Sequence, residues 1–174
     1  MLLTSDPEAV QQLLGIYSAI DNRVHRITSR RPDWSCRKGC DQCCRQLAQP
    51  PVLTAAEWDL MQQGLRQLAP AQQTAVAYRI QALADVQSGP ITCPLLEPAQ
   101  GTCLVYQQRP ALCRMYGFYS SGMHNLWCDM LQTRYEAGAF DKVVLGNQSP
   151  VERALQSHGG KTQSLLAWHG GTTD

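Results

Sequence analysis

Four of the chain's eight cysteines lie within ten residues, in the segment SCRKGCDQCC that covers residues 35 to 44. Thiols at this density serve one of three chemistries: a disulfide framework, a redox-active thiol pair, or a site for a soft metal. In a reducing compartment, cysteines in a chain of this size are more often metal ligands or catalytic thiols than disulfide partners. The segment therefore favours a metal site, with the other two chemistries as alternatives.

The spacing of Cys36, Cys40 and Cys43 suits convergence on one metal. In helical or turn-like backbone, residues three and four apart lie on the same face, so these three sulfurs can meet. Thiolates select zinc, cuprous copper or iron–sulfur clusters over hard cations. Adjacent residues cannot easily direct both side chains at one tetrahedral centre, so we expect Cys44 to point elsewhere.

A four-thiolate site needs a ligand from outside this triplet, and four later cysteines are available. Eight cysteines would suffice for two such sites, and the spacing does not assign the partition. All of them are candidate metal ligands: Cys36, Cys40, Cys43, Cys44, Cys93, Cys103, Cys113 and Cys128. His124 could replace one of them, but a surface position is favoured for it because the cysteines already suffice.

Basic residues surround the dense cysteine segment. Residues 23 to 45 hold seven arginines and lysines against Asp33 and Asp41, an excess of five positive charges. A tetrathiolate centre carries a formal charge of about −2, which nearby cations would stabilise. Arg109 and Arg114 flank Cys113 and are predicted to contact the cofactor by hydrogen bonding to a sulfur. The alternative for both is a solvated arginine beside a helix start.

The elements that must position these residues are predicted to be mainly helical. The longest helix is expected over residues 6 to 28, with Ser5 as N-cap and Glu8 completing a capping box. The predicted helices that follow begin at the Thr54–Glu57 capping box, cover residues 71 to 86, start at Pro110, and run from Ser149 to Gly159. The tail after Trp168 is expected to fray.

Between Cys93 and Cys128 the apolar periodicity fades, which predicts a long loop containing one short helix. Such a loop is unusual in a compact domain unless something else fixes it, and a metal centre would do so. We therefore predict a single domain over residues 1 to 174, in which irregular cysteine-bearing loops surround a metal centre. Trp34 and Trp127 lie close to cysteines and are expected to shield the centre from water.

The composition excludes several partners. No segment approaches the length of continuous apolar sequence that spans a membrane. The start, MLLTSDPEAV, has no basic residue before its short apolar run, so we expect a cytoplasmic protein rather than a secreted one. The net charge of +1 and the lack of interleaved aromatic residues make nucleic acid an unexpected partner. An unidentified redox or protein partner is expected instead.

Three stretches together resemble the YkgJ-like cysteine-cluster family, the CxxCxxCC domain that chelates zinc or iron. They are CRKGCDQCC at 36–44, CPLL at 93–96 and GTCLVYQQRPALCR at 101–114. The resemblance implies a metal-chelating domain whose ligand candidates are the seven cysteines from Cys36 to Cys113, with Cys128 fitting a later family cysteine less specifically. The domain also occurs in flagellin lysine methylases, which implies an iron–sulfur centre and methyl transfer to lysine as one further reading.

The sequence thus predicts a metal-binding protein with a cysteine-ligated iron–sulfur centre, expected to be of the four-iron type, or with zinc. The centre could be redox-active or transfer electrons. The alternatives are a structural zinc module that binds a partner and a small methylase-related enzyme. A radical-type enzyme is a further alternative, because the spacing of the first three cysteines is similar to the radical S-adenosylmethionine signature. Gln42, however, stands where those enzymes usually carry an aromatic residue.

Overall fold

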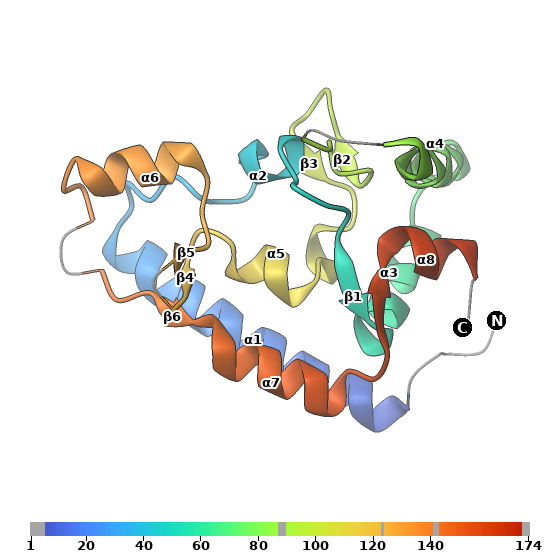
Figure 1. Ribbon diagram of the computed structural model, residues 1–174, viewed down its shortest axis with the longest axis horizontal. Helices are drawn as coiled ribbons and strands as arrows, with labels where there is room; N and C mark the ends of the chain where they lie inside the picture. Colours follow the sequence, from blue (N-terminus) through green and yellow to red (C-terminus); the bar gives the residue numbers. More distant parts are fainter. Residues whose placement is uncertain (1–5, 87–89, 123, 141–142, 172–174) are drawn as a thin grey trace.

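The computed structural model describes residues 6–86, 90–122, 124–140 and 143–171. Over these residues the fold is mainly helical, as predicted, with eight α-helices and two short 3-10 helices (Figure 1). The α-helices are α1 (Pro7–Arg30), α2 (Gln42–Arg45), α3 (Ala55–Arg66), α4 (Pro70–Gln81), α5 (Ala111–Met115), α6 (Asp129–Glu136), α7 (Gln148–His158) and α8 (Leu165–Gly170). The 3-10 helices are η1 (Ala82–Asp85) and η2 (Tyr106–Gln108).

Helix α1 confirms the predicted long helix to within two residues at its C-terminal end. Its N-cap is Asp6, whose carboxylate accepts a hydrogen bond from the Glu8 amide at 2.9 Å. The predicted cap, Ser5, lies outside the described residues. Asp6 takes this role because its carboxylate directly precedes the first helical residue and can reach the free amides of the first turn.

The capping box predicted at the start of α3 is present. The Thr54 hydroxyl accepts from the Glu57 amide, and the Glu57 carboxylate accepts from the Thr54 amide. The helix predicted over 71–86 is instead α4 followed directly by η1, so the backbone tightens after Gln81. Helix α7 ends at Gly159 as predicted.

Strands are short, and two of the four strand pairings join segments that are distant in sequence. Strand β1 (Val52–Thr54) pairs antiparallel with β7 (Thr162–Ser164), and β2 (Leu96–Glu97) pairs with β3 (Thr102–Cys103). Strand β4 (Tyr119–Ser121) lies between β5 (His124–Asn125), which is antiparallel, and β6 (Gly146–Asn147), which is parallel. The predicted loop over 93–128 therefore contains short strands, η2, and the expected short helix, α5, which begins after Pro110.

Two hydrophobic cores form the interior. The first joins α1 to α5, α6 and the region of β4, with Leu13, Ile20 and Met115 among its buried residues. The second joins β1, α3, α4 and α8, with Leu53 and Ile80 fully buried. In Figure 1, α6 and α4 lie at opposite ends of the molecule, and α2 and α5 lie between them. Helix α3 contributes to both cores, with Ala56 in the first and Met61 in the second, and the cysteine-bearing helices α2 and α5 lie between the two ends.

The C-terminal helix α8 continues beyond the point where fraying was predicted, and residues 172–174 lie outside the described residues. Fraying was predicted after Trp168, but α8 continues to Gly170. The Trp168 indole N–H donates to the Leu53 carbonyl at 2.9 Å, and its ring stacks on Trp58 at a centroid distance of 6.4 Å. These contacts with the second core explain why the helix persists. Among the described residues, no helix has both the length and the apolar character needed to cross a membrane.

Candidate metal centre

The dense cysteine segment folds as a turn followed by one helical turn. The Cys40 amide donates to the Arg37 carbonyl at 2.9 Å, and Gly39 has a φ of +92°, which only glycine adopts readily. Helix α2 then carries Cys43 and Cys44, whose sulfurs are 4.0 Å apart. All eight cysteines are free thiols.

One set of cysteines lies on the side of the first core. Cys36 and Cys128 both pack against that core, and the Cys36 thiol donates to the Tyr116 carbonyl at 3.5 Å. Burial raises the pKa of Cys36 to about 12, and the thiols of Cys43, Cys40 and Cys128 raise it further in that order. Such effects act over short range, so these four thiols are neighbours.

A second set lies on the side of the second core, against which Cys44, Cys93 and Cys103 pack. The Cys93 amide donates to the Cys44 carbonyl at 2.6 Å, and Cys103 pairs with Leu96 across the β2–β3 hairpin. The hydrogen bond with Cys43 lowers the pKa of Cys44. A bond with Cys93, burial and the nearby thiols outweigh it and raise this pKa to about 12.

Cys113 lies on α5 between these sets. The residue retains exposed surface, yet the loss of hydration around its sulfur raises the pKa of the thiol, followed by the effects of Cys43, Cys44 and Cys103. The pKa of Cys43 is also raised, first by its hydrogen bond with Cys44 and then by burial. The fold therefore gathers thiols from 36–44, 93–113 and 128 into one region.

The donor chemistry of this region fits a soft metal, because closely grouped thiols become strong ligands once deprotonated. In the part of the chain that the structure describes, however, no group of three or more His, Cys, Asp or Glu side chains is arranged as a ready-made metal site. Rotation of cysteine side chains between staggered rotamers is the movement that binding would require.

Arg109 is the cation that acts on thiols from both sets. Its charge opposes the rise in the pKa of Cys36, Cys103 and Cys113. The guanidinium carbon lies 3.7 Å from the centroid of the Tyr106 ring. Its Nε is buried and has no hydrogen-bond partner among the described residues, so this N–H is available to a sulfur.

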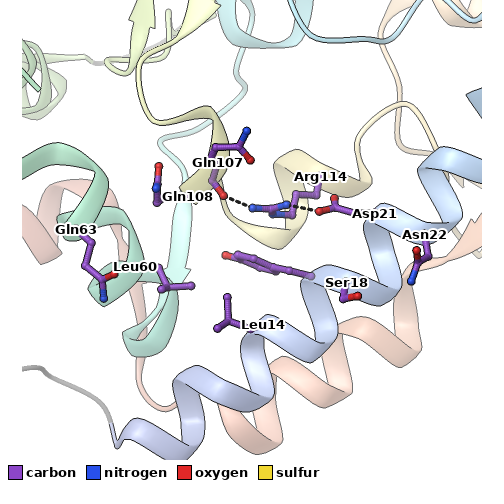
Figure 2. A pocket seen from close by; sticks show the side chains of 10 residues that line it. Leu14, Ser18, Asp21, Asn22, Leu60, Gln63, Gln107, Gln108 and Arg114 are labelled. Carbon is purple, nitrogen blue, oxygen red and sulfur yellow. Dashed lines mark hydrogen bonds and ion pairs between the residues drawn. The ribbon is translucent and has the colours of Figure 1, made fainter. Parts of the chain in front are cut away.

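Arg114 is directed at α1 instead. Figure 2 shows its guanidinium between Asp21 and Gln107, beside an open pocket of about 420 Å³. Its Nη1 donates to the Asp21 carboxylate at 2.7 Å, its Nε donates to the Arg109 carbonyl at 3.0 Å, and Nη2 donates to the Gln107 carbonyl. These bonds fix the backbone on either side of Cys113, whereas no contact of Arg114 with a sulfur is present among the described residues.

Glu57 is a further positioning residue, which the sequence indicated only as a cap. It is 3% exposed, and one carboxylate oxygen accepts from the Ala111 amide at 2.8 Å and from the Tyr17 hydroxyl at 3.4 Å. The other oxygen accepts from the amide and hydroxyl of Thr54. One buried carboxylate thus ties the start of α5 to α3 and α1. The capping motif predicts the bonds of this second oxygen to Thr54, but no local pattern predicts the bonds of the first oxygen to Ala111 and Tyr17.

The remaining candidates lie at the edge of this region. His124 is exposed in β5, opposite Ser121. Trp34 is 2% exposed and stacks on Phe118, and its indole N–H donates to the Gly117 carbonyl at 3.2 Å. Trp127 packs against the same first core as Cys36 and Cys128. The shielding role expected for the two tryptophans remains a prediction.

Residues 35–136 match the family model CxxCxxCC, whose description reads "Putative zinc- or iron-chelating domain". The match spans more than half of the chain and includes all eight cysteines. The protein therefore belongs to the CxxCxxCC family, which confirms the resemblance found in the sequence. No curated protein and no solved structure matches the chain.

Proposed function

We propose that this protein holds an iron–sulfur cluster, of the four-iron type, on cysteine thiolates between its two hydrophobic cores. Membership of a zinc- or iron-chelating family supports metal binding in general. The observation that carries the proposal is the gathering of free thiols from three distant stretches of chain into one region. Thiolates of this number and softness are the ligands that such clusters use.

The position of Arg109 near the thiols supports a charged centre. A cluster with four thiolates is anionic, and Arg109 lies where its charge acts on three of the thiols. Its unpaired buried Nε–H can donate to a cluster sulfur, a contact that tunes the potential of such centres. When bound, the cluster would accept or donate one electron. This chain's residues would hold it, exclude water and balance its charge.

Zinc is the second candidate, and the grouping of free thiols is compatible with either metal. Both metals displace thiol protons on binding, so loading releases protons. A zinc centre would act structurally, by adding a link between the two cores to the one that α3 already makes. In that case the protein would serve as a module that binds a partner rather than as an electron carrier.

Metal and sulfide analysis of anaerobically purified protein separates these candidates. Iron with an equal amount of acid-labile sulfide, together with broad visible absorption that dithionite bleaches, supports the cluster. Colourless protein that releases zinc to a chelator supports the second candidate. Protein that contains neither metal, and that binds neither iron with sulfide nor zinc on reconstitution, would end the proposal.

A further inference from the structure

We infer that the eight cysteines form two four-thiolate sites, with Cys36, Cys40, Cys43 and Cys128 in the first and Cys44, Cys93, Cys103 and Cys113 in the second. This inference rests on the proposed function, because it assumes that the thiols bind metal. It goes further in assigning each sulfur and in giving the number of centres. The two sites would lie side by side between the two cores.

The division of the cysteines between two hydrophobic cores is the main observation. Cys36 and Cys128 pack against the first core, which α1, α5 and α6 build. Cys44, Cys93 and Cys103 pack against the second core, which β1, α3 and α4 build. None of these five cysteines is common to both cores among the described residues. A single site that combined thiols of both sets would have to draw some of them away from one of the cores.

Backbone contacts hold the second set together independently of any metal. The Cys93 amide donates to the Cys44 carbonyl at 2.6 Å, and the Leu47–Ile91 bridge pairs the same two segments. The β2–β3 hairpin then returns the chain so that the Leu104 amide donates to the Leu95 carbonyl at 2.9 Å. Cys44, Cys93 and Cys103 are thus fixed near one another by main-chain pairing, and Cys113 is assigned to this set because the first set already holds four thiols.

The first set combines local spacing with one distant residue. Cys36, Cys40 and Cys43 follow the three- and four-residue spacing that lets sulfurs share a face. Cys128 joins them because the Gly117 amide donates to the Leu126 carbonyl, which brings the segment before α6 onto the segment that contacts Cys36.

Cys43 and Cys44 are adjacent in sequence but are assigned to different sites. Successive residues of a helix project about 100° apart, since 3.6 residues make one turn. Neighbours on α2 can therefore serve different centres although their sulfurs are 4.0 Å apart. An adjacent pair of cysteines on α2 therefore lets one helical turn supply a ligand to each site.

Metal stoichiometry of the wild-type chain is the first test. We expect about two zinc ions, or about eight iron and eight sulfide ions, per chain at saturation. One zinc ion or four iron ions at saturation would overturn the inference while leaving the proposed function intact. Failure of the chain to bind any metal would instead overturn the proposed function, so the two failures are distinguishable.

Cadmium-113 NMR of the cadmium-substituted chain tests the assignment of each sulfur. We expect two resonances in the wild type. C36S, C40S and C128S should each shift or abolish one resonance, and C93S, C103S and C113S the other. C43S and C44S are the matched pair, because the same change at adjacent positions should affect different resonances. A pattern in which C128S and C103S alter the same resonance, or C43S and C44S do, would overturn the assignment. Serine is close to cysteine in size, so the variants should fold. If one variant of a site cannot be purified, another variant of the same site still tests the assignment.

Discussion

The thiol of Cys36 lies against the backbone of Gly117. A Cβ atom at this glycine would be 2.6 Å from the Cys36 sulfur, and its φ of +88° is one that other residues rarely adopt. We therefore predict that G117A destabilises the fold by about 1–3 kcal/mol from backbone strain alone, with a further cost from the clash. Metal content should fall with it, because Cys36 is displaced. Chemical denaturation and metal analysis measure both effects.

Two other glycines provide matched controls for this substitution. Gly138 has a φ of +72° but open space around its Cβ position, so G138A isolates the strain. Gly15 lies in α1 with open space and an ordinary φ, so G15A should stabilise the helix by about 0.5–1 kcal/mol. Loss of metal in G138A as large as in G117A would show that the contact with Cys36 is not responsible.

Arg109 is predicted to set the electronic properties of the centre. R109Q removes a positive charge that acts on three thiols, so the oxidised cluster should be favoured and the reduction potential should fall. R109K keeps the charge but loses the buried Nε–H, and its potential should lie between those of R109Q and the wild type. Spectroelectrochemical titration provides the measurement. A potential that is unchanged in R109Q would remove Arg109 from the centre.

Asp33 should contribute to stability in a defined acid window. The hydrogen bond from Arg31 is the main cause that lowers its pKa to about 2, and Arg134 also pairs with it at 3.0 Å. A carboxylate with a depressed pKa stabilises the folded state above its ordinary pKa, and this contribution is lost as the pH falls through the folded value. Between about pH 4 and pH 2, the melting temperature of the metal-free wild type should therefore fall more steeply than that of D33N. Parallel curves would contradict this assignment.

At the scale of the elements, the short helix α5 depends on contacts from outside itself. Five residues are too few for a helix to be stable alone, and its first amide is held by the Glu57 carboxylate. E57Q should lower the free energy of unfolding by about 1–3 kcal/mol. One accepting carboxylate oxygen becomes an NH₂ group, which leaves buried donors without an acceptor. E57Q should also change the metal spectrum, since Cys113 lies on α5.

Thr54→Ala is the control for this prediction. It removes the hydroxyl cap of α3, at a cost of about 1 kcal/mol, and leaves the bond between Glu57 and Ala111. Circular dichroism melts give the loss of stability in T54A and in E57Q. The spectra of the two metal-bound variants should then be compared under conditions in which both have lost the same stability. A spectrum equally altered in T54A and E57Q would mean that α5 is not positioned through Glu57.

Elements whose stabilising pattern lies within their own residues could be predicted from the sequence, and elements that depend on distant contacts could not. Helices α1 and α3 have caps and apolar periodicity within their own residues, so they were predicted closely. Helix α6 was missed because it buries only Leu131 among its eight residues. Strand β1 was missed because its partner, residues 162–164, lies more than a hundred residues away. No pattern within three residues can signal such pairing.

The same limit applies to the site. Residue type and spacing identified the cysteines as ligand candidates, since softness and convergence are local properties. Tertiary packing decided which thiols are neighbours: Cys93 meets Cys44 through a main-chain bond between distant segments. It also turned Arg114 toward Asp21, on a helix that sequence spacing could not orient.

At the scale of the whole molecule, the proposed metal region lies between two cores that share helix α3 and otherwise draw on different elements. We predict that the metal-bound protein melts in one transition and that the metal-free protein melts at lower temperature in two. The decrease should be at least about 10 °C, because each kcal/mol moves the midpoint of a chain of this size by about 2–4 °C. Differential scanning calorimetry of both forms is the measurement, with metal restored to the stripped protein as control. One transition at the same temperature in both forms would show that metal does not join the cores.

The pairing of β1 with β7 has a practical consequence for protein production. An excised fragment with the boundaries of the family match would keep neither α1 nor the partner strand of β1. Leu53, Trp58 and Met115 would then be uncovered, and such surfaces promote aggregation. Expression trials that trim the flanks should therefore yield inclusion bodies, whatever the supply of metal.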